Sequence, residues 1–312
     1  MKGLSVLVVA GSLLVVVTTA GCGLGAGSDD GVASLSVTAD FGSVPVGKVA
    51  KTKPTSSETA MRQLQRLYPV STSFGGRFVK GIGNRSGGSR GGRPFDWFYF
   101  VNGAEAPVGA ADTLVRNGDS VWWDYRDWGA ATHVPAVVGS WPHPFTGTGS
   151  NKRPSVRILC AQAADSACTV VEKQLAAVGA NVSRGAFGAA VQGSPVRVLV
   201  GEWKVIRSDP AAQLLEQGPS ASGVYLKPAA SGDTVSLLNP TGNLARSLGT
   251  GSSFVAATVL DAGPPTWVVS GTSAGSVASA ASHLTERDLH LHYAVAWTAN
   301  RAYSAPQVGI GE

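Results

Sequence analysis

The alternation of apolar and polar positions predicts strands in the first half of the chain. Leu35 to Phe41 alternates in this way, and Phe95 to Val101 is aromatic on both faces, which is typical of a strand covered on both sides. Asn102-Gly103 follows the second run directly and is a strong signal for a two-residue hairpin turn. We therefore expect an aromatic hairpin in this region.

A second turn signal, Asn117-Gly118, leads into another run of aromatic residues. Strand periodicity assigns alternate residues of this run to one face, namely Val121, Trp123 and Tyr125. The same rule assigns Trp122 and Asp124 to the opposite face. This strand is therefore also expected to be covered on both sides.

One helix is predicted between these strands. Apolar residues recur at helical spacing at Ala60, Leu64 and Leu67, after a possible start at Ser56-Ser57-Glu58 and before a stop at Pro69. Strands combined with a single helix indicate a small α+β sheet.

The second half alternates strand and helix patterns, which favours an α/β mixed-sheet domain over residues 154–300. Asp209-Pro210 is a clear helix start, because aspartate caps the helix and proline suits its first turn. The expected strands are 156–160, 196–200, 224–226, 235–238, 254–260 and 267–270, and the expected helices are 169–178, 209–216 and 276–284. The Pro/Gly-rich segment 129–153 is interpreted as a linker or strap, and 301–312 as a C-terminal tail.

The N-terminus predicts export. Met1-Lys2 is a short basic region, and Leu4 to Val17 is an apolar run too short for a comfortable transmembrane helix. The run ends in Thr19-Ala20-Gly21-Cys22, which resembles a bacterial lipoprotein signal; this resemblance implies that Cys22 is lipidated. Residues 1–22 would then be the signal peptide, 23–33 a flexible tether, and the body would lie at the outer face of the cell membrane. The alternative is an ordinary secretory signal with Cys22 unmodified.

The chain has 312 residues and 3 cysteines. With Cys22 set aside, Cys160 and Cys168 remain, and an exported protein occupies a compartment where disulfides persist. We expect a structural disulfide between them, with a pair of buried thiols as the alternative. No cofactor is expected, because the sequence contains no P-loop, no dinucleotide-binding glycine motif and no zinc-protease motif.

Charge is segregated along the first half. Residues 48–93 contain ten basic residues and one acid, whereas residues 94–127 contain six acids and two arginines. The arginine–glycine stretch 84–93 is similar to segments of RNA-binding tails, but export argues against nucleic acid as a partner. An acidic ligand, an anionic lipid or a wall polymer remains open beside a merely solvated loop.

Two further patterns bear on possible chemistry. Gly271-Thr272-Ser273-Ala274-Gly275 has the spacing of a hydrolase nucleophile elbow, but too little chain follows for the usual acid and histidine on later strands. We expect Ser273 to cap a helix, with an anion cradle and a serine nucleophile as alternatives. His133 and His143 are expected to be surface packing residues, with no metal site and no catalytic residue.

Three spaced motifs in the first half carry a family resemblance. Gly76-x-Phe78-Val79-x-x-Ile82, Trp97-x-Tyr99-x-Val101-Asn102-Gly103 and Gly118-Asp119-x-Val121-Trp122-x-x-Tyr125 resemble the C-terminal β-domain of transcobalamin and intrinsic factor, and still more its bacterial relatives of unknown function. The resemblance covers residues 34–128 and implies a β-grasp-like domain. In the animal carriers this domain closes over cobalamin opposite a helical barrel, for which this chain has no counterpart.

The sequence therefore predicts a membrane-anchored, extracytoplasmic binding protein. Its ligand would be a small molecule, with a corrinoid implied by the resemblance, and the protein would serve a transporter. The expected ligand-binding residues are Trp97, Tyr99, Trp123, Tyr125 and Trp128, in a cleft whose facing wall the second domain could supply. The alternatives are an envelope interaction module without a small ligand and, more remotely, a hydrolase that uses Ser273.

Overall fold

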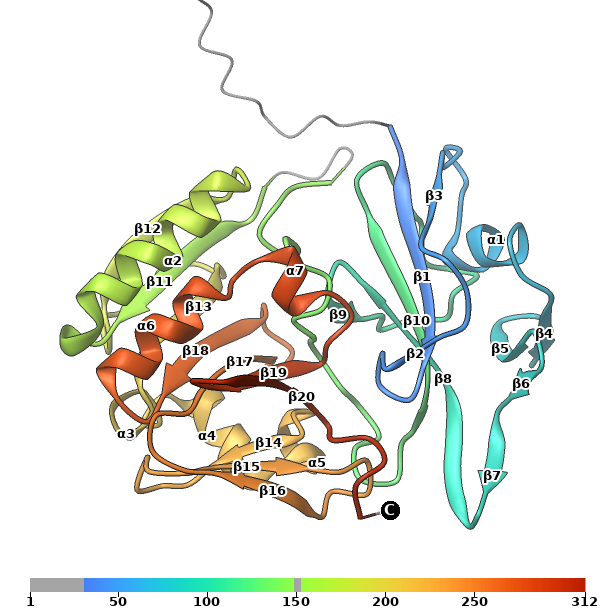
Figure 1. The fold of residues 1–312 in the computed structure, drawn as a ribbon. Coiled ribbons are helices and arrows are strands. Elements are labelled where there is room, and N and C mark those ends of the chain that lie inside the picture. The colour runs from blue at the N-terminus through green and yellow to red at the C-terminus, as the bar shows by residue number, and fades with distance from the viewer. Residues whose placement is uncertain (1–30, 149–152, 312) are drawn as a thin grey trace, which may run out of the picture.

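The structure, a computed structural model, describes residues 31–148 and 153–311. Cys22, the expected signal peptide 1–22 and most of the expected tether 23–33 lie outside the described residues. The chain has a mixed α+β fold built mostly of strands in several sheets, with few helices (Figure 1). The general fold class expected from the sequence is thereby confirmed.

The first sheet is centred on three long strands. β1 (Ala33–Ala39) lies parallel to β10 (Ser120–Asp127), which pairs antiparallel with β8 (Arg93–Val101). Short strands extend the two sides: β2 (Val44–Pro45) and β3 (Ala50–Thr52) pair with β1, and β7 (Gly88–Arg90) and β9 (Ala104–Glu105) pair with β8. The predicted Asn102-Gly103 turn joins β8 to β9, with both residues at positive φ as such a turn requires.

One face of this sheet is covered by α1 (Ala60–Gln65) and by a small sheet of β4 (Val70–Ser73), β5 (Phe78–Ile82) and β6 (Arg85–Ser86) (Figure 1). Thr59 caps the helix, because its hydroxyl accepts a hydrogen bond from the Arg62 N–H at 3.2 Å. The expected helix is therefore present, but Leu67 is 45% exposed and does not belong to its buried stripe.

The second sheet has the strand order β12-β11-β13-β18-β17-β19-β20. The first four strands are parallel and the others antiparallel. Their bounds are β11 Ser155–Cys160, β12 Asn181–Ala186, β13 Val196–Glu202, β17 Ser253–Thr258, β18 Thr266–Gly271, β19 Ala294–Thr298 and β20 Arg301–Ala305. β20 lies inside the segment expected as a C-terminal tail, and it pairs along its whole length with β19.

Helices α2 (Asp165–Ala177) and α6 (Ala274–Ser282) lie side by side on the second sheet (Figure 1). A short helical turn, η1 (Gln162–Ala164), precedes α2. Below the sheet in the same view lie α4 (Pro210–Gln217), α5 (Pro219–Ser222) and the hairpins of β14 (Leu226–Pro228), β15 (Val235–Leu238) and β16 (Leu244–Leu248). The remaining helices are α3 (Trp203–Ile206) and α7 (Glu286–Leu289).

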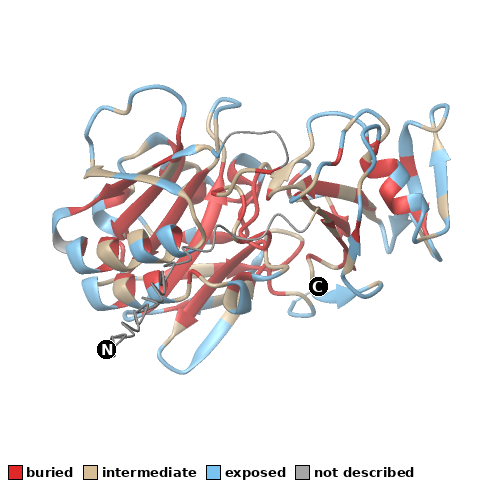
Figure 2. Cartoon of the chain, turned by 90° about the horizontal axis from the view of Figure 1, so that it is seen from above, coloured by how far each residue is buried: buried red, intermediate tan, exposed pale blue. Residues whose placement is uncertain are grey.

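Residues 129–148 form a strap that packs between the two sheets. Val134, Val137, Val138, Trp141 and Phe145 of this strap are buried in one core with residues of the second sheet. Phe100 and Trp122 of the first sheet belong to the same core, so buried residues continue from one sheet to the other (Figure 2). Of the two interpretations of this segment, the described part fits a strap and not a loose linker.

The junction also includes a buried polar contact. The carboxylate of Asp124 accepts hydrogen bonds from the Tyr293 hydroxyl at 2.9 Å, the Thr38 hydroxyl at 2.6 Å and the N–H groups of Phe41 and Gly42. Gly42 is needed here, because a Cβ would lie 2.0 Å from the Leu291 carbonyl oxygen. Burial raises the pKa of Asp124, an effect that these hydrogen bonds oppose.

Candidate functional site

An aromatic pocket lies at the edge of the first sheet, beside β8. Its volume is about 340 Å³, within the range of small-molecule sites. We call this cavity the aromatic pocket; its walls are formed by Arg77, Phe78, Val79, Asp96, Trp97, Phe98, Tyr99, Glu105, Ala106, Val108, Gly109, Ala110, Trp123, Trp128 and Thr132. These residues belong to the first sheet, its cover, the loop after β9, or Trp128 and the strap that follows it. The second sheet therefore does not supply the facing wall that the sequence suggested.

Three buried aromatic side chains form the inner part of the pocket. Tyr99 and Trp123 are stacked, with ring centroids 4.6 Å apart. The Tyr99 hydroxyl donates to the Val108 carbonyl at 2.6 Å and pairs with the Thr113 hydroxyl at 2.7 Å. Trp97 donates from its indole N–H to the Arg85 carbonyl at 3.1 Å. These contacts fix the rings before any ligand arrives.

Four of the five aromatic residues expected to bind ligand border this one pocket, namely Trp97, Tyr99, Trp123 and Trp128. Tyr125 does not line it. Its ring stacks on Phe95 at 5.5 Å and packs against Trp97, and its hydroxyl donates to the Ser86 carbonyl. Tyr125 therefore lies beside the wall and packs against Trp97, because the strand places it two residues beyond Trp123 on the same face.

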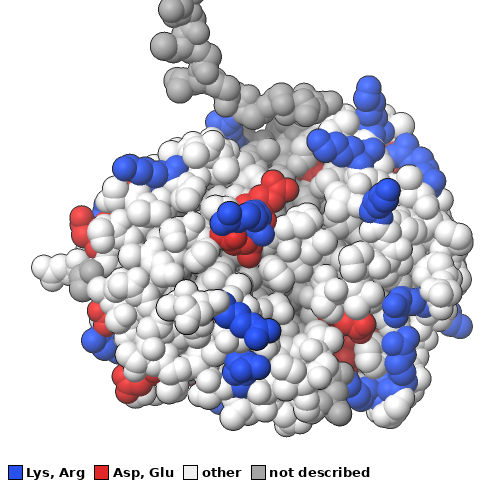
Figure 3. Space-filling model, viewed as in Figure 1, with Lys and Arg blue, Asp and Glu red and all other residues white. Residues whose placement is uncertain are grey.

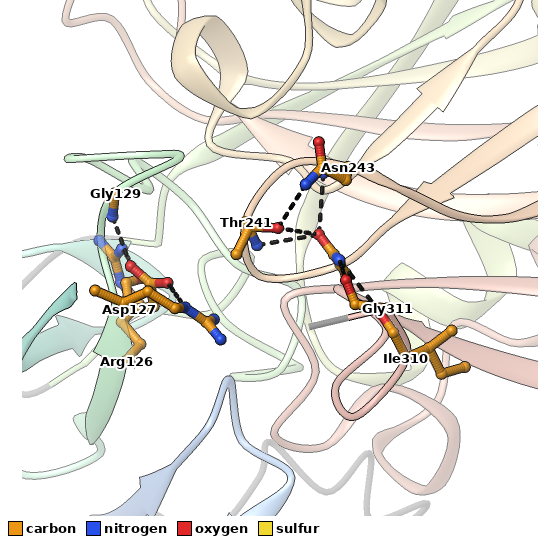
Figure 4. Close-up of polar contacts among 9 residues, drawn as sticks. Arg126, Asp127, Gly129, Thr241, Asn243, Ile310 and Gly311 are labelled. Atoms are coloured by element: carbon orange, nitrogen blue, oxygen red, sulfur yellow. Dashed lines mark hydrogen bonds and ion pairs between the residues drawn. The ribbon is translucent and has the colours of Figure 1, made fainter. Parts of the chain in front are cut away.

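Trp128 reaches the pocket from a turn whose two ends are fixed by hydrogen bonds of Asp127 and Arg126. The Asp127 carboxylate accepts from the Gly129 N–H at 2.8 Å and from Arg93 at 2.6 Å (Figure 4). Arg126 donates to the Ala131 carbonyl, and its guanidinium carbon lies 3.7 Å from the centre of the Phe98 ring. The half-buried Trp128 is thus positioned at the rim.

The pocket has few polar groups, and most of them already form hydrogen bonds or ion pairs within the protein. Burial raises the pKa of Asp96, whose carboxylate accepts from the Trp97 N–H at 2.9 Å. Glu105 accepts from the Val134 N–H at 2.6 Å, and Arg77 forms an ion pair with Asp112 at 2.9 Å. The Trp123 indole nitrogen is buried and has no hydrogen-bond partner within the described residues. An apolar ligand with a few polar groups suits such a site.

The strand β8 has an incomplete edge at this pocket. On the side away from β10, it pairs with β7 at residues 93–95 and with β9 at residues 100–101. Within the described residues, no strand pairs with 96–99 on that side, and these four residues all line the pocket. Ladder parity directs the main-chain groups of Trp97 and Tyr99 toward this gap. The Trp97 N–H donates to the Asp96 carboxylate and the Tyr99 carbonyl accepts from the Ala106 N–H at 3.1 Å, so the Trp97 carbonyl and the Tyr99 N–H are the groups left to face the gap. The pocket therefore combines aromatic rings with an open strand edge.

Several pocket residues were not expected from the sequence. Phe78 and Val108 come from β5 and from the loop after β9, and both are partly exposed. Asp96 alternates with the aromatic residues of β8, so its strand position could have indicated it. The loop residues carry no such signal, because only tertiary packing brings them beside β8.

Ser273 lies at the start of α6, away from the aromatic pocket. Its hydroxyl accepts from the Ser276 N–H at 3.3 Å, and the Ser276 hydroxyl accepts from the Ser273 N–H at 2.9 Å. This reciprocal capping box is the helix-cap role expected for Ser273. Cys160 and Cys168 form a disulfide between the end of β11 and α2, as expected.

The two histidines of the strap differ in burial: the expected surface position is correct for His133 and wrong for His143. His133 is exposed beside Glu105, whereas His143 is buried and pairs with the Thr146 hydroxyl at 3.1 Å. Within residues 31–148 and 153–311, no group of three or more His, Cys, Asp and Glu side chains is arranged to hold a metal ion. None of the helices in the same ranges has the length and apolar character of a membrane span.

Similarity to known proteins concerns part of the chain. Residues 57–127 match the family described as "Domain of unknown function (DUF4430)". A solved structure from Ruminococcus gnavus ATCC 29149, named a "putative metal binding protein", is similar at 14% identity over 31% of this chain and 96% of that chain, with a TM-score of 0.25. A search of curated proteins found no match.

Proposed function

We propose that the protein is an extracytoplasmic binding protein that takes a small ligand in the aromatic pocket. The observation that supports this most is the convergence of four aromatic side chains, Trp97, Tyr99, Trp123 and Trp128, on one cavity beside an open strand edge. Rings that are held by stacking and hydrogen bonds lose little freedom on binding, which favours affinity. Ser273 has a structural role in this proposal, and no catalytic step is part of it.

A corrinoid is the named candidate ligand, through the resemblance of residues 34–128 to the β-domain of the cobalamin carriers and the β-grasp-like fold it implies. A corrinoid is a flat macrocycle with amide groups around its rim. Aromatic rings suit its faces, and the Trp97 carbonyl and the Tyr99 N–H suit its amides. Since the pocket holds only about 340 Å³, one edge of the macrocycle would enter while the rest lay over the open mouth.

Membrane anchoring through lipidated Cys22 is the second part of the proposal. Eight residues, 23–30, separate Cys22 from the first described residue, and a chain of that length spans at most about 28 Å. The body would therefore stay close to the outer face of the membrane, where it could pass its ligand to a transporter.

The test is a titration of the purified full chain with cobalamin, followed by tryptophan fluorescence and corrected for inner-filter absorption with free tryptophan. Saturable quenching at micromolar concentration or below is expected. Trp128→Ala should weaken binding about tenfold without lowering Tm, because Trp128 is half-buried at the rim. Val205→Ala, at an exposed site on α3, is the matched control and should bind like the wild type. If the tryptophan fluorescence of the wild type does not change after the inner-filter correction, the corrinoid proposal is wrong.

A second candidate, from another class, is an envelope interaction module. The unpaired edge of residues 96–99 favours it, because such an edge accepts an extended segment of another chain as an added strand. Exposed basic residues lie on the neighbouring elements, namely Arg77, Lys80 and Arg90, and Figure 3 shows Lys and Arg side chains spread over this side of the molecule. An acidic extended segment with one apolar side chain for the pocket would complement them.

This candidate is tested with a synthetic peptide of alternating apolar and acidic residues, using the scrambled sequence as control. Saturable binding of the peptide, weakened by salt and absent with the scrambled control, would favour strand addition over a small ligand. Cobalamin quenching without peptide binding would favour the first proposal.

A further inference from the structure

The walls of the aromatic pocket carry more negative than positive charge. Asp96 and Glu105 contribute carboxylates, and Arg77 is the one Lys or Arg among the described residues that line the cavity. Arg77 is already neutralised by its ion pair with Asp112 at 2.9 Å, and 71% of its side chain is exposed. This local excess of negative charge contrasts with the basic segment 48–93, which supplies part of the same wall.

Asp96 is a carboxylate that no basic group of the fold neutralises. It is half-buried on β8 and accepts a hydrogen bond from the main-chain N–H of Trp97 at 2.9 Å. Burial raises the pKa of Asp96, and no cation among the described residues lies close enough to lower it. A half-buried charge without a partner is costly, and a bound cation would offset that cost.

Glu105 is the second carboxylate of the lining, and 15% of its side chain is exposed. One of its oxygens accepts from the Val134 N–H at 2.6 Å, and the other lies 3.4 Å from Nδ1 of the exposed His133. Within the part of the chain that the structure describes, Glu105 forms no ion pair with a lysine or an arginine. Two carboxylates that lack such a partner therefore share one cavity.

Aromatic rings of the same two strands already hold cations of the protein itself. The guanidinium carbon of Arg126 lies 3.7 Å from the centre of the Phe98 ring, and that of Arg90 lies 5.4 Å from the centre of the Tyr125 ring. Phe98 lines the pocket, and Tyr125 packs against the lining residue Trp97. The wall thus combines carboxylates with aromatic side chains, which is the combination that attracts an organic cation.

The lining also indicates which kind of cation fits. Metal ions such as Ca²⁺ need six or more oxygen ligands, and no group of three His, Cys, Asp or Glu side chains within residues 31–148 and 153–311 is arranged to hold a metal. A primary ammonium group is strongly hydrated, so it loses much on entering an aromatic cavity. An alkylated ammonium group presents methyl groups to the rings and keeps its charge for the carboxylates.

We propose that the aromatic pocket selects a ligand that carries a quaternary or alkylated ammonium group, which the tryptophan and tyrosine side chains surround and the Asp96 carboxylate attracts. This inference rests on the proposed function, because it names the class of ligand for the same pocket. It adds a requirement that the corrinoid candidate does not make, namely a positive charge on the group that enters the cavity.

The test uses choline and its uncharged isostere, the alcohol in which a tert-butyl group replaces the trimethylammonium group. Both are titrated calorimetrically into the purified full chain. Saturable binding of choline is expected, with affinity at least about tenfold higher than that of the alcohol. Asp96→Asn should weaken choline binding about tenfold and leave binding of the alcohol unchanged, because only choline interacts with the lost charge.

Two further variants separate this effect from general effects of mutation. Asparagine at position 96 can still accept the hydrogen bond from the Trp97 N–H, so Tm of Asp96→Asn should match that of the wild type. Asp261→Asn removes the same charge at an exposed position between β17 and β18, outside the lining, and should bind choline like the wild type. Trp128→Ala should weaken choline binding, since it removes a ring of the wall.

The outcomes distinguish this inference from the proposed function. Absence of saturable choline binding at millimolar concentrations, or equal affinity for choline and the alcohol, would overturn the inference. Equal choline affinity of Asp96→Asn and the wild type would overturn it too. If cobalamin binds and choline does not, the inference fails and the proposed function stands. If choline binds with the expected loss in Asp96→Asn and cobalamin does not, the inference stands and only the corrinoid candidate fails.

Discussion

The two faces of the first sheet hold adjacent tryptophans, Trp122 and Trp123, in different surroundings. Trp123 stacks on Tyr99 and lines the aromatic pocket, and its indole N–H is buried without a partner within the described residues. Trp122 donates to the Thr38 hydroxyl at 2.7 Å, packs at the junction of the two sheets and lines a small cavity there. One face is built around aromatic stacking, and the other around a fully bonded polar contact.

This difference shows how strand alternation gives the two faces of one strand different roles. Residues only one position apart in β10 belong to separate cavities with different chemistry, because successive side chains point to opposite faces. The aromatic face depends on ring packing for its shape. The junction face depends on Asp124, which gathers four hydrogen bonds from three parts of the chain.

The largest effect is expected from Asp124→Ala. This change leaves the donors from Thr38, Tyr293 and two main-chain N–H groups without their acceptor in a buried place, so the free energy of unfolding should fall by at least about 3 kcal/mol. Urea denaturation followed by circular dichroism measures it. Tyr293→Phe removes a single donor and should cost about 1 kcal/mol. A loss below about 1 kcal/mol for Asp124→Ala would mean that the two faces do not differ as described.

The matched pair Trp122→Phe and Trp123→Phe sharpens the comparison. Both changes leave a space of similar size, but only Trp122→Phe breaks a hydrogen bond. We expect Trp122→Phe to lower the free energy of unfolding by about 1 kcal/mol more than Trp123→Phe. The same denaturation experiment applies. Equal losses would show that the Trp122 hydrogen bond adds nothing.

Ser273→Ala is a control outside both faces. Loss of the capping box should reduce the free energy of unfolding by about 1 kcal/mol. Any esterase activity of the pure protein, measured with a chromogenic ester, should stay unchanged. A large loss of such activity would instead support the hydrolase alternative.

The smallest effect is expected from the charge cluster at α7, where the two sheets meet. The Arg287 hydrogen bond holds the pKa of Asp288 down at about 2, and His283 contributes as well. Because this pKa is depressed on folding, the stabilisation is present above about pH 4 and is lost as pH falls toward 2. Screening by solvent keeps it below about 1 kcal/mol. Asp288→Asn should flatten the stability curve between pH 4 and 2; an unchanged slope would contradict this.

Several elements in both halves of the chain could be predicted because their sequence signals are local. The alternation of residues 121–125 gave the correct faces, and Asn102-Gly103 marked the hairpin. Asp209-Pro210 marked the start of α4, and the Asp209 carboxylate accepts from the Ala211 N–H at 2.9 Å. Each of these depends on neighbours a few positions away.

Other features depend on pairing between distant segments, which no local pattern encodes. The gap at residues 96–99 exists because β7 and β9 both stop short along the same edge of β8. β12 and β20 were not expected, because their mixed sequences show no strong alternation before their partners are known. Ser140 looks like an ordinary loop serine until the strap buries it between the sheets.

The most direct measurement is amide hydrogen exchange across residues 96–99, with and without a saturating ligand that has been shown to bind. The N–H of Tyr99 faces the open edge of β8, so it should exchange quickly in the free protein. If the aromatic pocket is the binding site, either cobalamin or the alternating peptide should slow its exchange several-fold. Saturable binding with unchanged exchange at Tyr99 would contradict the assignment of this pocket as the ligand site.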